Sequence, residues 1–473
     1  MFNIIKVIFV FFFTGSISAQ IILPEDFEAE KIVSFGLGGE LGFAILDENR
    51  FIVISQFGKI EVVSKDRRTR IYDLSDSLIV DRESGLLGIA IDPDFPSEPY
   101  IYLFYSHTDS SNRVSKFEIS GDLNDLESHN LSVLFETEKI LISLPFESDI
   151  HHSGTLRFAK DKTLYISFGD NRKEILVQNL TTYNGKILRI KRDGSVPEDN
   201  PEFPEEPNGK KAEIFAIGFR NPFRFSIDRV GLLFIGDVGS HILEELNIST
   251  GGDNFGWPRF EGDSLRAPQN ELIPPEPKFP IFAYNKPPSR SVIALVAYHS
   301  NGKDRFPPEF IDTYFYADFF SDVEPIYYLK FVEGKWQRNE FLFGISRPVD
   351  ATIDRDGSLY ILDRSKAIYK ITYLRNPVHV DRYEKEKNID FINYPNPFNS
   401  VTNIFYRVTF SGFVTLKVYN ITGELVETLI NEVKQIGNYS VKFDASKLST
   451  SIYFYRLQID GRLLKTNKML YIK

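Results

Sequence analysis

The segment Ile353-Asp354-Arg355-Asp356-Gly357-Ser358-Leu359-Tyr360-Ile361-Leu362 contains the pattern that decides the fold. An apolar residue precedes a turn with acidic residues and a glycine, and a strand rich in aromatic and aliphatic residues follows. Acidic residues and glycine favour tight turns, whereas aromatic and β-branched side chains favour a pleated strand. The segment is therefore typical of a β-hairpin.

This pattern occurs six times along the chain. The other copies are Ile45-Leu46-Asp47 with Phe51-Ile52-Val53-Ile54, Ile91-Asp92-Pro93-Asp94 with Tyr100-Ile101-Tyr102-Leu103-Phe104-Tyr105, Asp161-Lys162-Thr163 with Leu164-Tyr165-Ile166-Ser167, Ile227-Asp228 with Leu232-Leu233-Phe234-Ile235, and Ile311-Asp312 with Tyr314-Phe315-Tyr316. They lie roughly 45 to 80 residues apart, which is enough for one four-stranded sheet and a variable loop. We therefore predict an all-β fold, a six-bladed β-propeller over residues 20–374. A pair of β-sandwiches is the competing interpretation, but its strands would follow at shorter and more even spacing.

The composition narrows the possible functions. A chain of 473 residues is too long for one small domain, so two folded domains are expected. The aromatic share of 14% favours strands. The chain has no cysteine, which excludes a disulfide framework, a thiolate metal site and a cysteine nucleophile. A formal net charge of −10 argues against a nucleic-acid partner.

Residues 1–19 are predicted to be a secretory signal peptide. Lys6 precedes the apolar run 7–13, and the small residues at 14–19 provide a cleavage site. This run is too short to span a bilayer, and no later stretch approaches ~20 apolar residues. The mature chain is expected to begin at Gln20, outside the cytoplasm, with no transmembrane segment.

The C-terminal part reads as a second β domain. A charged linker at 375–392 precedes alternating strands at 401–409, 414–420, 439–443 and 451–459. Alternation of apolar and polar residues predicts strands with one buried face, so we expect a small β-sandwich over residues 393–473.

The second domain also carries sequence motifs. It opens with Tyr394-Pro395-Asn396-Pro397-Phe398-Asn399 and closes with Lys468-Met469-Leu470. These motifs resemble those of the C-terminal sorting domain of type nine secretion cargo. The resemblance implies that the type nine secretion machinery is a partner, and that the chain passes through the periplasm to be secreted or kept at the cell surface.

Five segments of the first domain, in chain order, resemble the glucose/sorbosone dehydrogenase family of soluble quinoproteins. They are Glu83-Ser84-Gly85-Leu86-Leu87-Gly88-Ile89-Ala90, His151-His152-Ser153-Gly154-Thr155-Leu156, Gly185-Lys186-Ile187-Leu188-Arg189-Ile190, Gly218-Phe219-Arg220-Asn221-Pro222 and Gly252-Asp253-Asn254-Phe255-Gly256-Trp257-Pro258. The resemblance implies an oxidoreductase that removes hydride from C1 of an aldose sugar and transfers it to pyrroloquinoline quinone (PQQ).

The resemblance also implies roles for individual residues. His151 matches the base, and a neutral imidazole suits proton removal near pH 7. The quinone-binding positions match Arg220, Asn221 and Arg347, and the sugar contacts match Glu83 and Asn171. The backbone carbonyls of Gly239 and Ser240 match the calcium ligands.

Other positions depart from the family pattern. Glu83 replaces a glutamine, Ile150 an aspartate and Val349 a second arginine, and residues 319–322 contain no lysine. The loss of two of three cations would weaken the binding of a tri-acid, because each charge-assisted bond contributes ~1.5 to 3 kcal/mol. The alternative is thus a non-enzymatic propeller of this family that binds a carbohydrate or a protein. A third class, calcium-dependent lactone hydrolysis, would use Glu83, Asp170, Asn171 and Asn221.

Overall fold

The computed structural model divides into two compact units, residues 1–330 with 338–374 and residues 331–337 with 375–473. It describes residues 21–35, 39–65, 67–203, 209–228, 231–266, 277–285, 291–298, 306–319, 324–332, 335–364, 366–374, 391–408, 412–435, 437–459 and 462–472. The predicted signal peptide (1–19) and residues 375–390 of the predicted linker lie outside these ranges. No helix within them is long and apolar enough to cross a bilayer.

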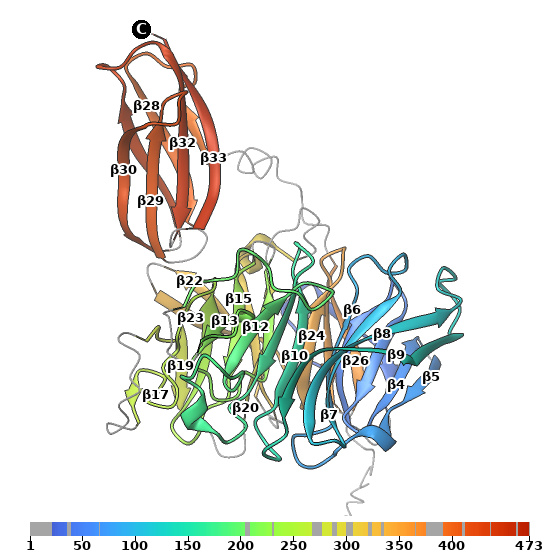
Figure 1. Cartoon of the computed structure of the whole chain (residues 1–473). Coiled ribbons are helices and arrows are strands. Elements are labelled where there is room, and N and C mark those ends of the chain that lie inside the picture. Colours follow the sequence, from blue (N-terminus) through green and yellow to red (C-terminus); the bar gives the residue numbers. More distant parts are fainter. Residues whose placement is uncertain are drawn as a thin grey trace, which may run out of the picture. The chain divides into compact units, whose positions relative to one another are not determined.

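The described part of the first unit contains six four-stranded sheets (Figure 1). In chain order they are β2 (Glu40–Ile45), β3 (Phe51–Ser55), β4 (Lys59–Ser64) and β5 (Arg67–Asp73); β6 (Leu86–Ile91), β7 (Tyr100–His107), β8 (Ser111–Gly121) and β9 (Leu131–Pro145); β10 (Ser153–Phe158), β11 (Leu164–Phe168), β12 (Lys186–Ile190) and β13 (Ile214–Ile217); β14 (Arg224–Ile227), β15 (Leu233–Asp237), β16 (Leu243–Ser249) and β19 (Phe282–Asn285); β20 (Ser291–Tyr298), β21 (Thr313–Phe319), β22 (Ile326–Val332) and β23 (Lys335–Leu342); and β24 (Pro348–Ile353), β25 (Leu359–Asp363) and β26 (Ala367–Tyr373) with β1 (Phe27–Ser34).

The remaining elements of this unit are short. They are the two-stranded sheet of β17 (Phe260–Glu261) and β18 (Ser264–Leu265) and the 3-10 helices η1 (Ser75–Ser77), η2 (Glu174–Leu176) and η3 (Pro308–Phe310). The prediction of an all-β fold is therefore confirmed for the described residues. Each of the six sequence copies lies at the connection between the first and second strands of one sheet.

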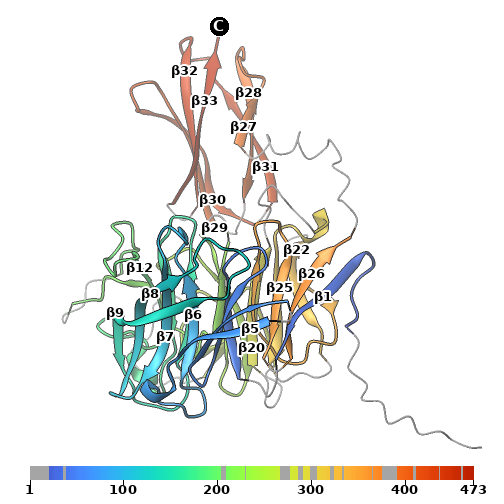
Figure 2. The same cartoon turned by 90° about the vertical axis from the view of Figure 1, so that its right-hand side faces the viewer.

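The six sheets contact one another in a closed order. The first strand of each sheet contacts the first strand of the next, from β2 through β6, β10, β14 and β20 to β24, and β24 contacts β2 again. The last sheet is completed by the chain's beginning, because β1 pairs antiparallel with β26 (Figure 2). Face-to-face packing leaves strands such as β3 buried at every residue, which explains why they do not alternate.

Arg224 connects four of these first strands. Its side chain on β14 is buried; Nε donates to the carbonyl oxygen of Val349 on β24 (2.8 Å), and Nη2 to that of Leu41 on β2 (2.6 Å). Nη1 donates to Oγ1 of Thr155 on β10 (3.0 Å). Burial lowers the pKa of Arg224 to about 10, so the guanidinium stays charged at neutral pH.

The described residues of the second unit form two sheets (Figure 1). One comprises β27 (Phe391–Tyr394), β28 (Val401–Val408) and β31 (Gly437–Asp444), and the other β30 (Leu425–Lys434), β29 (Gly412–Tyr419), β32 (Ser451–Ile459) and β33 (Arg462–Tyr471). Along β29, Val414, Leu416 and Val418 are buried and alternate with more exposed residues. Each such strand therefore has one apolar face, as the sequence alternation predicts.

We expect Arg224→Met to lower the free energy of unfolding by about 3 kcal/mol, because it leaves buried acceptors on three other strands without a donor. Differential scanning calorimetry of the whole chain measures the change. Arg355→Met is the control, since Arg355 is exposed and should change stability by less than about 0.5 kcal/mol. Equal melting temperatures for the two variants would contradict the structural role of Arg224.

Candidate functional site

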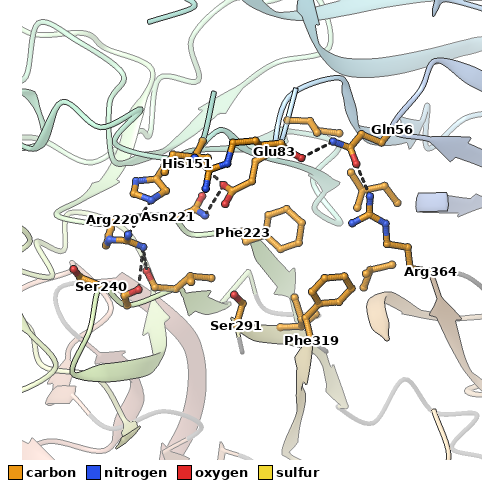
Figure 3. Close-up of a pocket in the computed structure, with 18 residues that line it drawn as sticks. Gln56, Glu83, His151, Arg220, Asn221, Phe223, Ser240, Ser291, Phe319 and Arg364 are labelled. Carbon is orange, nitrogen blue, oxygen red and sulfur yellow. Dashed lines mark hydrogen bonds between the residues drawn. The ribbon is translucent and has the colours of Figure 1, made fainter. Parts of the chain in front are cut away.

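A cavity of about 560 Å³ opens in the first unit (Figure 3). Its lining includes six of the eight residues that the sequence proposes for the site. They are His151, Arg220, Asn221, Glu83, Gly239 and Ser240. All six lie in connections between strands, and the packing of the sheets brings these connections together.

His151 is held between a carboxylate and a guanidinium. Its Nδ1 lies 2.7 Å from Oδ1 of Asp170, and Nη2 of Arg220 donates to its Nε2 (2.8 Å). A guanidinium only donates, so Nε2 carries a lone pair and the ring proton sits on Nδ1, directed at Asp170. The imidazole is thus neutral, in the tautomer that leaves Nε2 as the basic nitrogen.

Asp170 and Trp257 support this arrangement from behind. Trp257 Nε1 donates to Oδ2 of Asp170 (3.0 Å), and the Arg220 guanidinium lies 5.7 Å from the centre of the Trp257 ring. Both Asp170 and Trp257 are buried. The sequence indicates Asp170 only for lactone hydrolysis, whereas the structure places it against His151 Nδ1, where it orients the imidazole.

Glu83 and Asn221 form the adjoining wall. Oε2 of Glu83 accepts the backbone N–H of His151 (2.7 Å) and the side-chain amide of Asn221 (3.5 Å). Asn221 Oδ1 accepts from the hydroxyl of Ser153 (2.9 Å). The Glu83 carboxylate therefore fixes the backbone at His151 through this hydrogen bond, and it also lines the cavity.

Two predicted residues do not line the cavity. Asn171 is buried and donates from Nδ2 to the carbonyl oxygen of Pro145 (3.2 Å). Arg347 is exposed, whereas Val349, two residues along the strand, does line the cavity. A direct role of Asn171 or Arg347 in ligand contact would need a rearrangement of these positions.

The sequence analysis missed two arginines, Arg82 and Arg364, that line the cavity. Figure 3 shows Arg364 on the side opposite His151 and Arg220, with Phe223 between them. Arg364 directly follows the sixth repeat strand, the second strand of its sheet. The starts of first strands and the residues after second strands border this cavity, so this sequence position could have indicated Arg364.

The lining suits an anionic, flat ligand such as PQQ. The lining carries two guanidinium groups (Arg220 and Arg364) and one carboxylate (Glu83), and Phe223 and Phe319 offer apolar surface. Arg82 also lines the cavity, but its guanidinium pairs with Asp149 at the surface. Guanidinium groups bind carboxylates and quinone oxygens through their planar set of donors.

Calcium fits this site less well. The carbonyl oxygens of Gly239 and Val238 both accept from Nη1 of Arg220 (2.9 Å each), so a guanidinium occupies the place of a cation. Among the described residues no group of three or more His, Cys, Asp or Glu side chains is placed to hold a metal ion. Calcium at Gly239 and Ser240 therefore stays a prediction.

A buried carboxylate lies in the segment that follows Gly239 and Ser240. Burial raises the pKa of Glu245 to about 7, and the nearby carboxylates of Glu261 and Glu244 add to the shift. Asn247 donates from Nδ2 to Oε2 of Glu245 (3.2 Å), while its own Oδ1 is buried without a partner. A protonated Glu245 would satisfy that oxygen after a flip of the Asn247 amide.

Comparison with known proteins gives matches for both units. Residues 39–370 match the family model "Glucose / Sorbosone dehydrogenase", and residues 393–473 match "Secretion system C-terminal sorting domain". Quinoprotein glucose dehydrogenase B of Acinetobacter calcoaceticus is 31% identical over 204 residues, which cover 38% of this chain and 41% of that protein. Aldose sugar dehydrogenase YliI of Escherichia coli is 28% identical over 233 residues, which cover 48% and 60%. The chain thus spans about half the length of these curated relatives.

Solved structures share the fold of the first unit. The PQQ-bound form of aldose sugar dehydrogenase from Streptomyces coelicolor superposes with a TM-score of 0.57 at 21% identity, covering 74% of this chain and 99% of that one. The apo-form of the soluble aldose sugar dehydrogenase from Escherichia coli gives a TM-score of 0.60 at 23% identity, covering 73% and 99%. At these identities the likeness concerns the fold.

We expect Glu245→Gln to stabilise the protein at pH 8 and to leave stability nearly unchanged at pH 5. The folded pKa of about 7 exceeds the unfolded value near 4.5, so the folded state binds more protons between them. The free energy of unfolding therefore falls as pH rises from about 4.5 to 7, because the buried Glu245 must lose its proton. Glutamine does not ionise, so the variant lacks this decrease. Melting temperatures of both proteins from pH 5 to pH 8 give the test, and parallel pH curves would contradict it.

Proposed function

This chain belongs to the glucose/sorbosone dehydrogenase family, and from that premise we propose that it is a secreted oxidoreductase that oxidises the C1 hydroxyl of aldose sugars with PQQ. In this proposal the six sheets of residues 20–374 are the blades of one propeller. The observation that carries the proposal is the Asp170–His151–Arg220 arrangement, whose basic nitrogen points into a cavity with an excess of positive charge.

His151 is the proposed general base. Its Nε2 accepts the C1 hydroxyl proton once Arg220 turns its Nη2 from this nitrogen to the ligand. Asp170 accepts from Nδ1–H at 2.7 Å, so it holds the ring in place and stabilises the imidazolium that forms. The bound quinone would supply the hydride acceptor.

Arg220 and Asn221 are the proposed quinone-binding residues. Arg220 is anchored through Nη1 by the carbonyl oxygens of Val238 and Gly239, and its Nη2, which donates to His151 in this structure, is the group that turns to the ligand. A fixed cation close to the base is placed to stabilise negative charge that develops on a ligand oxygen. Glu83 is the proposed sugar contact, because its carboxylate accepts hydrogen bonds and faces the cavity. Asn171 and Arg347 keep the roles that the resemblance implies only if these positions rearrange.

The alternative is a non-enzymatic propeller that binds a carbohydrate or a protein. The exposed position of Arg347 and the valine at 349 favour it, since both remove positive charge from the places that the family pattern gives it. The orienting contact between Asp170 and His151 favours the enzyme, because a mere binding surface needs no fixed tautomer.

We also propose that residues 393–473 direct the chain through the type nine secretion machinery to the outside of the cell. The match to the sorting-domain model supports this role. The route through the periplasm follows from the predicted signal peptide at 1–19.

We expect the protein reconstituted with PQQ to reduce a dye with aldoses, and His151→Gln to lower kcat by about 10²- to 10⁴-fold. Quinone affinity, measured by titration calorimetry, should change little, because His151 acts on the hydroxyl proton. Failure of the wild-type chain to bind the quinone at micromolar concentrations would refute the enzyme proposal.

His152→Gln is the matched control. His152 is buried, stacks on Phe146 at 5.1 Å, and contacts Asn112 through Nδ1 (3.1 Å). Burial lowers its pKa to about 4, so it stays neutral over the assay range. A loss of kcat equal to that of His151→Gln would move the base to the neighbouring residue.

We expect chelation of calcium to raise the Kd for PQQ by less than about threefold, because Arg220 already occupies the Gly239 carbonyl. Titration with and without EDTA measures this. If EDTA weakened the affinity for PQQ by more than tenfold and added calcium restored it, this expectation would be wrong and the predicted calcium at Gly239 and Ser240 would be supported.

A further inference from the structure

We propose that Arg364 is a ligand-binding residue that holds a carboxylate of the quinone on the wall opposite His151 and Arg220. This inference rests on the proposed function and assigns one of its cationic contacts to a residue outside the family pattern described above. Figure 3 shows the two guanidinium groups, Arg220 and Arg364, facing each other across the cavity.

The first support is the surroundings of the Arg364 guanidinium. Arg364 is half-buried and lines the cavity, and its Nη2 donates to Oε1 of Gln56. Within the described ranges no carboxylate pairs with this guanidinium. Burial lowers the pKa of Arg364, and the charge of Arg347 adds to that effect, whereas the carboxylate of Glu40 opposes it without pairing directly. A guanidinium withdrawn from water without a directly paired anion is costly, and an anionic ligand relieves that cost.

The second support is the way Arg364 is oriented. Nε2 of Gln56 donates to the carbonyl oxygens of Arg82 and Ser84 (2.8 Å each), which fixes the amide with its oxygen toward Arg364. Gln56 is buried. A neutral amide thus holds the cation by one amino group, and among the described residues no other acceptor is bonded to its remaining N–H groups.

The third support is the arrangement of the last sheet. The backbone N–H of Arg364 donates to the carbonyl oxygen of Arg347 (2.9 Å), so these two arginines lie opposite each other at the ends of β25 and β24. Arg347 is exposed, and Val349 offers the cavity only an apolar side chain. β24 therefore contributes no positive charge to the cavity, whereas Arg364, directly after β25, contributes one.

Titration calorimetry with PQQ tests the assignment without an activity assay. We expect Arg364→Gln to raise Kd by tenfold to a hundredfold, because one charge-assisted contact is lost. Arg355→Gln, which removes an exposed cation that does not line the cavity, should change Kd by less than about threefold. Melting temperatures of both variants report whether the fold is retained.

The trimethyl ester of PQQ separates a carboxylate contact from an indirect effect. Wild type and Arg364→Gln should bind the ester with equal, weaker affinity, since no carboxylate remains for Arg364. An unchanged Kd for PQQ in Arg364→Gln, or an equal penalty with the ester, would overturn the inference while the proposed function stands. Absence of PQQ binding by the wild type would instead refute the proposed function, and this inference with it.

Discussion

A buried guanidinium holds together the strands on which the candidate site is built. Arg224 on β14 donates to Leu41 on β2, Thr155 on β10 and Val349 on β24. A buried charge is tolerated only when its donors are satisfied, so these bonds define how closely the four strands approach. Leu41 and Val349 also line the cavity, so the same bonds position part of its wall.

The cavity combines a polar side around His151 with a cationic far side around Arg364. On one side, Asp170, His151 and Arg220 form a connected set that leaves one imidazole nitrogen as acceptor. On the other side, Arg364 faces the cavity with a neutral partner, Gln56. The cavity thus has a guanidinium on each side although position 349 is a valine.

Several features could be predicted from particular residues. The Ile353–Leu362 segment and its five other copies mark the connection between the first two strands of every four-stranded sheet. His151, Arg220, Asn221 and Glu83 reach one cavity, as their motifs indicate. Arg347 and Asn171 are outside it, because both lie in connections between strands, where a motif match does not reveal the direction of a side chain.

The sequence alone determined the strands and turns, because turn chemistry and strand preference act within about ten residues. It also determined which residues can do the chemistry, since proton acceptors and cations are recognisable by type. Only the tertiary structure decided which charges share the cavity. Gln56 and Arg364 are separated by 308 positions and meet because the last sheet packs against the first. Such contacts depend on how sheets far apart in the sequence pack together, and no local pattern encodes them.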